Sequence, residues 1–255
     1  MVKVKCSTFK PFIALFYGVF LCLFQSCTFD NEAQIIVDKS IAAHWGEGWE
    51  TIKMEFDFRD IHYTLQRGKD GYSNYSREFE DSLSRSVRDV LVNGEFQRYV
   101  QGNAVEVTKD KERAYSNSVN SVMYFNLLPV VLNDQAVNKQ LIGEVAIHDK
   151  PYFLLKVTFD KDGGGDDHDD VYLYWIDKES YLIDYLAYEF HVDGGGKRFR
   201  EAINRREIGG VQFQDYKNFK ADDAEDIFII DDLFQQEKLE ILSEIINENV
   251  DIQIK

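Results

Sequence analysis

The chain has 255 residues, of which 44% are hydrophobic and 14% aromatic, and its 29 Lys and Arg face 45 Asp and Glu for a formal net charge of −16. This acidic balance excludes a nucleic-acid-binding protein, because phosphate backbones require a basic surface. It also argues against docking onto anionic lipid headgroups. The length is sufficient for one domain with a sizeable core.

The N-terminus has the pattern of an export signal. Three lysines within the first ten residues precede the uncharged apolar run Phe12–Phe24. This run is shorter than the roughly 20 residues that a membrane-spanning helix needs, so it predicts a secretory signal. The small residue Ser26 before Cys27 favours lipoprotein processing, which predicts a signal peptide over 1–26 and lipid on Cys27. Ordinary cleavage nearby, giving a soluble periplasmic protein, is the alternative.

Cysteine usage agrees with export. Cys6, Cys22 and Cys27 are the three cysteines, and all lie in the signal or at its end, so the mature chain 27–255 has no thiol for a disulfide, a nucleophile or a zinc cluster. Cleavage removes three lysines and no acids, which leaves 26 basic and 45 acidic residues, about −19. We therefore expect an outer-membrane lipoprotein, on the periplasmic or cell-surface face, attached to the membrane through its N-terminal lipid.

The mature chain begins with a helical pattern. Apolar residues at partly helical spacing predict a helix over Glu32–His44, and Gly46 and Gly48 end it. His44 lies at the end of this helix, where a cationic side chain interacts favourably with the C-terminal carbonyls. This capping role is favoured over a ligand role.

From Trp49 onward the apolar residues alternate with polar ones, as in half-buried antiparallel strands. The turn signals "KDG" and "NGE" separate successive strands. The predicted strands read "WETIKMEFDF", "IHYTLQR", "GYSNYSREF", "RDVLVN", "EFQRYVQ", "AVEVT", "LIGEVAIHD", "YFLLKVTFD", "DVYLYWID", "YLIDYLAYEFHV", "KRFREAINR" and "GVQFQDYKNFK". The pattern predicts a mainly β (α+β) fold, a curved antiparallel sheet or unclosed β-barrel forming one domain. A short helix and then a strand are expected over residues 231–255.

One helical segment interrupts the strands. The stretch "ERAYSNSVNSVMYFNLLPVVLND" predicts a helix at about 113–126, which Pro129 ends. Residues 122–132 are strongly apolar and form either a lid over a cavity or a plug that closes the barrel end. The candidate lid residues are Val122, Met123, Phe125, Leu127 and Leu128. The 19 Phe, 14 Tyr and three Trp of the chain either line a ligand cavity or fill a core.

An acidic, glycine-rich loop between two predicted strands is the strongest candidate for chemistry. Residues 160–170 contain six aspartates, one histidine and three consecutive glycines. Oxygen ligands on such a loop suit Ca²⁺, and the histidine permits a transition metal. The candidate metal ligands are Asp162, Asp166, Asp167, His168 and Asp169. The alternative is a solvated turn, or one whose acids pair with Arg198 and Arg200.

The start of this loop recurs further along the chain. Phe159-x-x-Asp162-Gly-Gly-Gly is repeated as Phe190-x-x-Asp193-Gly-Gly-Gly, with two strands and a tight turn at Asp177–Ser180 between the copies. In an antiparallel meander, loops two strands apart emerge at one end of the sheet, about 10 Å from each other. We therefore predict that both glycine loops are neighbours, with Lys197, Arg198 and Arg200 across from the acids.

Four segments carry a family resemblance: "AHWGEGW", "FNLLPVVLND", "GGGDDHDDVYLYWIDKESYLIDYLAYEFHVDGGGKRFREA" and "GGVQFQDYKNF". They resemble a domain-of-unknown-function family of envelope lipoproteins from Bacteroidota-type Gram-negative bacteria. The order of helix, β-meander, helical lid and β-meander is similar to the outer-membrane lipoprotein carrier and receptor (LolA/LolB-like) fold. That resemblance implies an unclosed antiparallel barrel whose concave face holds acyl chains.

Three hypotheses for function remain open. The first is a lipoprotein that binds a hydrophobic or lipid-like ligand in a half-barrel cavity. The second is an envelope enzyme, metal-dependent or not, that uses the Asp162–Asp170 loop. The third is a structural or interaction lipoprotein without a small ligand.

Overall fold

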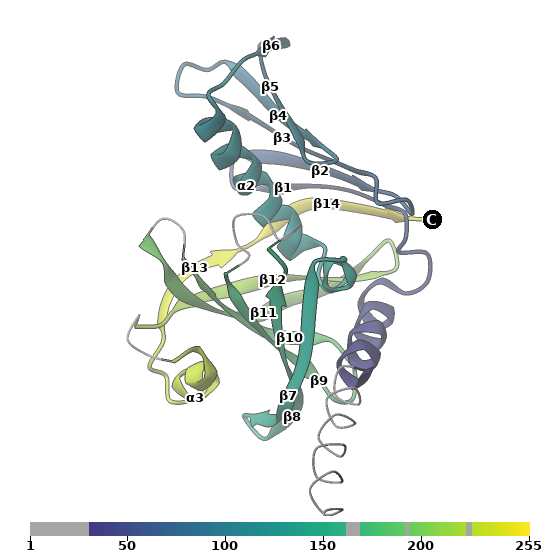
Figure 1. Ribbon diagram of the computed structural model, residues 1–255, viewed down its shortest axis with the longest axis vertical. Coiled ribbons are helices and arrows are strands. Elements are labelled where there is room, and N and C mark those ends of the chain that lie inside the picture. Colours follow the sequence, from purple (N-terminus) through teal and green to yellow (C-terminus); the bar gives the residue numbers. More distant parts are fainter. Residues whose placement is uncertain (1–30, 162–168, 192–193, 223–225) are drawn as a thin grey trace, which may run out of the picture.

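The computed structural model describes residues 31–161, 169–191, 194–222 and 226–255. These residues form two seven-stranded antiparallel sheets that do not close into a barrel (Figure 1). The predicted mainly β, unclosed antiparallel fold is confirmed, with its strands divided between two sheets. No helix in these ranges is long and apolar enough to cross a membrane.

The first sheet has the order β14-β1-β2-β3-β4-β5-β6. Its strands are β1 Ile52–Phe58, β2 Ile61–Arg67, β3 Ser73–Glu80, β4 Ser86–Val92, β5 Glu95–Val100, β6 Asn103–Val105 and β14 Asn247–Ile254. In β1 the alternation Ile52, Met54, Phe56 buries one face, as its sequence predicts.

The second sheet has the order β13-β12-β11-β10-β9-β8-β7. Its strands are β7 Val137–Ile147, β8 Lys150–Phe159, β9 Val171–Asp177, β10 Ile183–Phe190, β11 Gly196–Ile208, β12 Val211–Lys220 and β13 Glu240–Ile245. Both faces of this sheet are covered, which explains why residues 172–177 of β9 are all buried.

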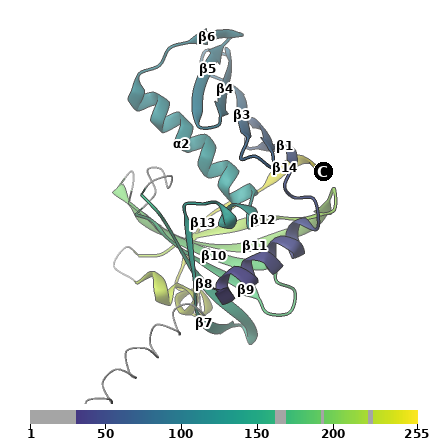
Figure 2. The same cartoon turned by 45° about the vertical axis from the view of Figure 1, so that its right-hand side comes forward.

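Helices cover the sheets (Figures 1 and 2). Residues 31–45 are helical, in agreement with the predicted N-terminal helix. The helical segment expected at about 113–126 is α2, Lys109–Asn126, and the turn η1, Val130–Asn133, follows it. The turn η4, Ile227–Ile229, leads into α3, Ile230–Gln235.

Two hydrophobic clusters hold this arrangement together. The larger lies between the sheets and includes the inner face of the 31–45 helix, the C-terminal end of α2 and η1. Within it, the Trp45 indole N–H donates to the Leu128 carbonyl over 3.0 Å, so a buried polar group is satisfied. The smaller cluster lies on the other face of the second sheet, where Trp175 and Phe199 pack under α3 with Ile230.

The C-terminus differs from its prediction. A helix is followed by two strands, β13 and β14, and not by one. Whereas β13 pairs with β12 in the second sheet, β14 pairs with β1 in the first. Residues 240–254 therefore cross from the second sheet to the first (Figure 1).

His44 does not cap its helix as a cation. Its side chain is buried, its Nδ1–H donates to the Gln212 carbonyl over 3.1 Å, and its Nε2 accepts from the Ile183 N–H over 3.0 Å. Burial is the main reason that the pKa of His44 falls to about 4. The histidine is therefore neutral and joins the N-terminal helix to β10 and β12.

Candidate functional site

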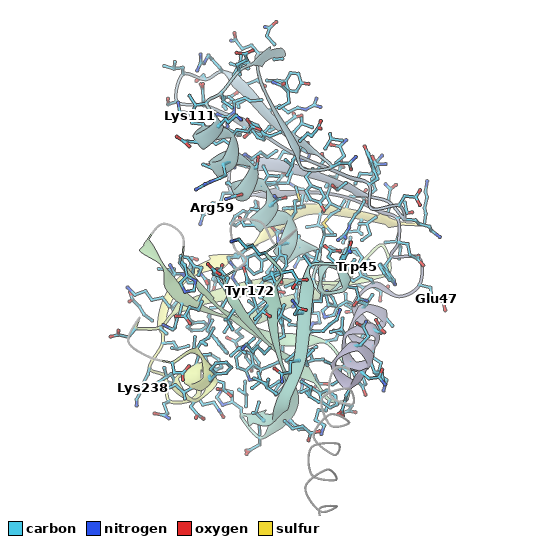
Figure 3. The ribbon with its side chains drawn as sticks, in the orientation of Figure 1. Trp45, Glu47, Arg59, Lys111, Tyr172 and Lys238 are labelled. Atoms are coloured by element: carbon cyan, nitrogen blue, oxygen red, sulfur yellow. The ribbon has the colours of Figure 1, made fainter. Side chains whose placement is uncertain are left out.

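A groove of about 330 Å³ lies between the two sheets, beside the C-terminal half of α2. Its aromatic walls come from both sheets and from the helix, and they consist of Phe58, Phe125, Tyr172, Tyr188 and Phe190. Figure 3 labels Arg59 and Tyr172, which both line the groove: Arg59 lies in the turn between β1 and β2, and Tyr172 lies in β9 of the second sheet. Such a volume and lining fall at the lower end of the range for small-ligand sites.

The wall formed by α2 is fixed to the second sheet. Tyr124 of α2 and Tyr174 of β9 share a 2.6 Å hydrogen bond between their hydroxyl groups, and the ring of Tyr124 packs against Tyr172 with 5.5 Å between ring centroids. Burial raises the pKa of Tyr124, so both hydroxyl groups stay neutral and hydrogen-bonded. This side of the groove is thus preformed.

The floor of the groove carries a polar row. Arg200 of β11 is the register partner of Asn218 of β12, and Asn218 is the register partner of Ser243 of β13. Register partners project from the same face of a sheet, so the three side chains lie next to one another. All three line the groove, together with Asn247.

Several polar atoms of this floor lack partners. Arg200, Asn218 and Asn247 are only 8%, 7% and 5% exposed. In the described part of the chain, the Arg200 Nε and the Oδ1 atoms of Asn218 and Asn247 are buried without a hydrogen-bond partner. Buried polar groups are nearly always satisfied, and each unsatisfied one costs about 1–3 kcal/mol. Because three such atoms belong to residues that line one groove, this groove is the strongest candidate for a ligand site.

Other surface hollows are less suited to an apolar ligand. A larger one of about 530 Å³ lies along β7 and β8. Its lining is mainly polar, with Asn138, Lys139 and Gln140 among the residues. Such a surface offers mainly hydrogen-bonding groups and little apolar area for a hydrophobic ligand.

The model of a family of unknown function, DUF6503, matches residues 14–247. The chain belongs to this family. No curated protein matches the DUF6503 chain. The family match therefore gives no activity for this chain.

Solved structures show distant likenesses. The DUF6503 chain is similar to a LolA superfamily protein from Nitrosomonas europaea, with 12% identity, 75% of this chain and 87% of that chain covered, and a TM-score of 0.48. It is also similar to a putative outer membrane lipoprotein-sorting protein domain from Vibrio parahaemolyticus, with 10% identity, 74% and 86% covered, and a TM-score of 0.42.

The predicted neighbourhood of the two glycine loops is confirmed for their described ends. Phe159 ends β8 and Phe190 ends β10, on either side of β9. At the bases of the loops, the His191 N–H donates to Asp170 Oδ1 over 3.2 Å. Asp170, the last residue of the acidic loop, and Phe190, the last residue of β10 before the second loop, both line the groove.

The turn on which this geometry depends is also present. Asp177 Oδ1 accepts hydrogen bonds from the N–H groups of Glu179 and Ser180, and the Ser180 hydroxyl donates to the same oxygen. An aspartate that bonds its own following backbone is typical of tight turns.

The pairing of the loop acids with Lys197, Arg198 and Arg200 remains a prediction, because Asp162, Asp166 and Asp167 lie outside the described residues. Lys197 forms an ion pair with Glu189 at 3.1 Å, and the Arg198 guanidinium stacks over Phe190 at 5.0 Å. Arg200 points into the groove, where it contacts Tyr188 and Phe125. The reason is the pleat of β11, which directs Arg198 and Arg200 to the inner face of the sheet.

The candidate metal ligands remain a prediction. Asp162, Asp166, Asp167 and His168 lie outside the described residues, and Asp169 is exposed in a turn. Elsewhere in the described chain, no group of three or more His, Cys, Asp or Glu side chains is arranged to hold a metal ion. A Ca²⁺ site and an enzyme built on the Asp162–Asp170 loop therefore stay hypotheses from the sequence.

The five candidate lid residues divide into two sets. Val122 and Phe125 line the groove. Met123, Leu127 and Leu128 are buried in the core between the sheets. The division follows the helical period, because Val122 and Phe125 lie three residues apart on one face of α2.

Sequence reasoning missed the polar floor of the groove. Arg200, Asn218 and Asn247 were not candidate ligand residues, and Arg200 was expected across from the acidic loop. The alternation in the sequence points the other way, because Arg198 and Arg200 flank the apolar Phe199 as solvent-facing residues of a half-buried strand would. The row itself comes from the register of β11, β12 and β13, which the sequence alone does not reveal.

Proposed function

We propose that this DUF6503 protein is an envelope lipoprotein that binds a hydrophobic, lipid-like ligand in the groove between its two sheets. The observation that supports it most directly is the coincidence of aromatic walls with unsatisfied buried polar atoms at one groove. Aromatic walls favour an apolar chain, and the polar floor favours a head that forms hydrogen bonds. A site with both features is suited to an amphiphile.

Binding of a hydrophobic fluorescent dye tests this proposal. We expect wild-type protein to bind the dye and Val122→Asp to weaken binding by roughly tenfold or more, because a carboxylate in the apolar wall must be desolvated. Leu83→Asp is the matched control, since Leu83 is 71% exposed and lies outside the groove. Equal affinities of wild type, Val122→Asp and Leu83→Asp, with both variants folded, would contradict the proposed site.

The membrane anchor is tested separately. We expect Cys27→Ser to release the protein from the membrane fraction, because the lipid on Cys27 is its proposed attachment. Cys22→Ser, which alters the signal but not the lipidated residue, should leave the protein in that fraction. Labelled fatty acid that still attaches to Cys27→Ser would show that lipidation occurs elsewhere.

A further inference from the structure

We propose that the ligand of the groove is an anionic amphiphile and that Arg200 binds its head through the guanidinium group. This inference rests on the proposed function and adds the charge class of the ligand. It predicts selectivity for a carboxylate or phosphate head on an apolar chain, and it does not require a particular chain length.

Arg200 differs from the other buried basic side chains of the described residues. Arg77 pairs with Asp89, and Lys197 pairs with Glu189. The polar contact of the Arg200 guanidinium is the hydrogen bond from Nη2 to the Tyr188 hydroxyl at 2.9 Å, and no carboxylate of the described chain pairs with it. A buried cation without an anion is costly, which implies that a ligand supplies the missing charge.

The guanidinium is held in one orientation. It lies over the Phe125 ring at 3.7 Å from the centroid, and Tyr188 anchors Nη2 from the other side. In the described chain, the Nη1 atom of Arg200 makes no hydrogen bond, and it is not fully buried. Arginine presents its donors in a planar fork that matches carboxylate and phosphate oxygens. A fixed fork on a groove floor is thus suited to an oxyanion.

Among the described residues, the charges that line the groove favour an anion over a cation. Arg59 also lines the groove and is exposed, with its guanidinium 5.0 Å from the Phe58 ring centroid. Asp170 is the one acid that lines the groove in the part of the chain that the structure describes, and it accepts the His191 N–H. Arg200 of β11 pairs with Leu186 of β10. Asp170 comes just before Val171 of β9, which pairs with Glu189, three residues further along β10. This register separates the acid from Arg200 by at least roughly 10 Å along the strands.

The rest of the floor suits a head with further polar groups. The unsatisfied Oδ1 of Asn218, directly across from Arg200, accepts hydroxyl or N–H donors. Asn247 Oδ1 offers a second acceptor. The apolar chain of the ligand then lies against Val122, Tyr172 and Phe190.

A ligand series on wild-type protein tests the charge class. Lauric acid, lauryl phosphate, lauryl alcohol and laurylamine share one chain and differ in the head. In displacement of the bound dye, we expect the acid and the phosphate to bind roughly 10- to 100-fold more tightly than the alcohol, because a charge-assisted hydrogen bond is worth about 1.5–3 kcal/mol. Inorganic phosphate and acetate alone should displace no dye and give no binding heat.

The outcomes separate the two proposals. If the alcohol binds as tightly as the acid, the charge inference is wrong and the groove remains a hydrophobic site. If free phosphate binds as tightly as lauryl phosphate, the site takes small anions and the amphiphile is wrong. If no amphiphile displaces the dye and the dye itself does not bind, the proposed function fails first.

Arg200→Met tests the residue itself. We expect the variant to lose the 10- to 100-fold preference for acid over alcohol while it retains alcohol binding, because only the charge contact is removed. Its melting temperature should be unchanged or higher, since the buried unpaired charge is gone. Arg200→Lys should keep part of the preference. Arg88→Met, an exposed arginine outside the groove, is the control. An unchanged preference in folded Arg200→Met would overturn the assignment.

Discussion

Asp89→Ala is expected to lower the free energy of unfolding by about 3–5 kcal/mol, the range for removing one partner from a buried ion pair. Asp89 is 0% exposed and is bound by two arginines. Arg77 donates from Nε to Oδ2 over 2.8 Å, and Arg98 donates from Nε to Oδ1 over 2.6 Å. Alanine leaves both guanidinium groups without an anion in a largely dry site.

The same cluster attaches α2 to the first sheet. Arg77 Nη1 donates to the Ser118 hydroxyl over 2.7 Å, and Arg98 stacks on the Tyr115 ring at 3.6 Å. Because α2 forms one wall of the groove, we also expect Asp89→Ala to weaken dye binding. The measurements are urea unfolding followed by circular dichroism, and dye titration at a temperature where the variant is folded.

The same two strands provide a matched control. Glu78 and Arg88 are the register neighbours of Arg77 and Asp89, but they lie on the opposite face with a separation of 3.6 Å and with 52% of each side chain exposed. Glu78→Ala should change stability by less than about 1 kcal/mol, because solvent screens exposed pairs. A cost for Asp89→Ala as small as that for Glu78→Ala would show that the cluster is not buried in solution.

Acid is expected to remove about 3 kcal/mol of stability between pH 6.5 and pH 4 through His44 alone. The folded-state pKa of this histidine is about 4, against 6.5 for an unperturbed histidine, with burial as the largest cause. Above pH 6.5 it is neutral in both states. Between these values the unfolded chain binds a proton that the folded chain does not, so stability falls as pH falls.

The hydrogen bonds explain why the folded protein resists this proton. Nε2 of His44 accepts the Ile183 N–H, so protonation there would place two N–H groups against each other. The effect of Asp177 is separate, because hydrogen bonds from Lys150 and Ser180 outweigh its desolvation and lower its pKa to about 2. Its stabilising contribution is lost mainly below pH 4, outside the histidine window.

Unfolding free energies of wild type and His44→Gln at several pH values test this. The variant should be less stable at pH 7 and should lose most of the slope between pH 6.5 and pH 4. His62→Gln is the control, since His62 is exposed and contacts Asp57 at the surface. A slope that is unchanged in His44→Gln, or abolished in His62→Gln, would assign the acid sensitivity to other groups.

Local patterns in the sequence were sufficient for much of the fold. The alternation in β1 and β2 predicts both strands, because a strand with one buried face repeats every two residues. The turn at Asp177–Ser180 depends on side-chain bonds to its own backbone, so it is also a local property. Together with strand parity, that turn was enough to place Phe159 and Phe190 at one end of a sheet.

Only the tertiary structure decided which distant segments meet. Nothing in "NENVDIQI" indicates that this last strand pairs with β1 and not with its sequence neighbour β13. His44 looks like a helix-capping cation until β10 and β12 bury it and satisfy both ring nitrogens. Likewise, Arg200 closely follows the second glycine loop in sequence, yet the pleat of β11 and the position of α2 place its guanidinium over the Phe125 ring. Burial and partner choice arise from packing over long sequence distances, and these determine whether a charged residue is a surface contact or part of a site.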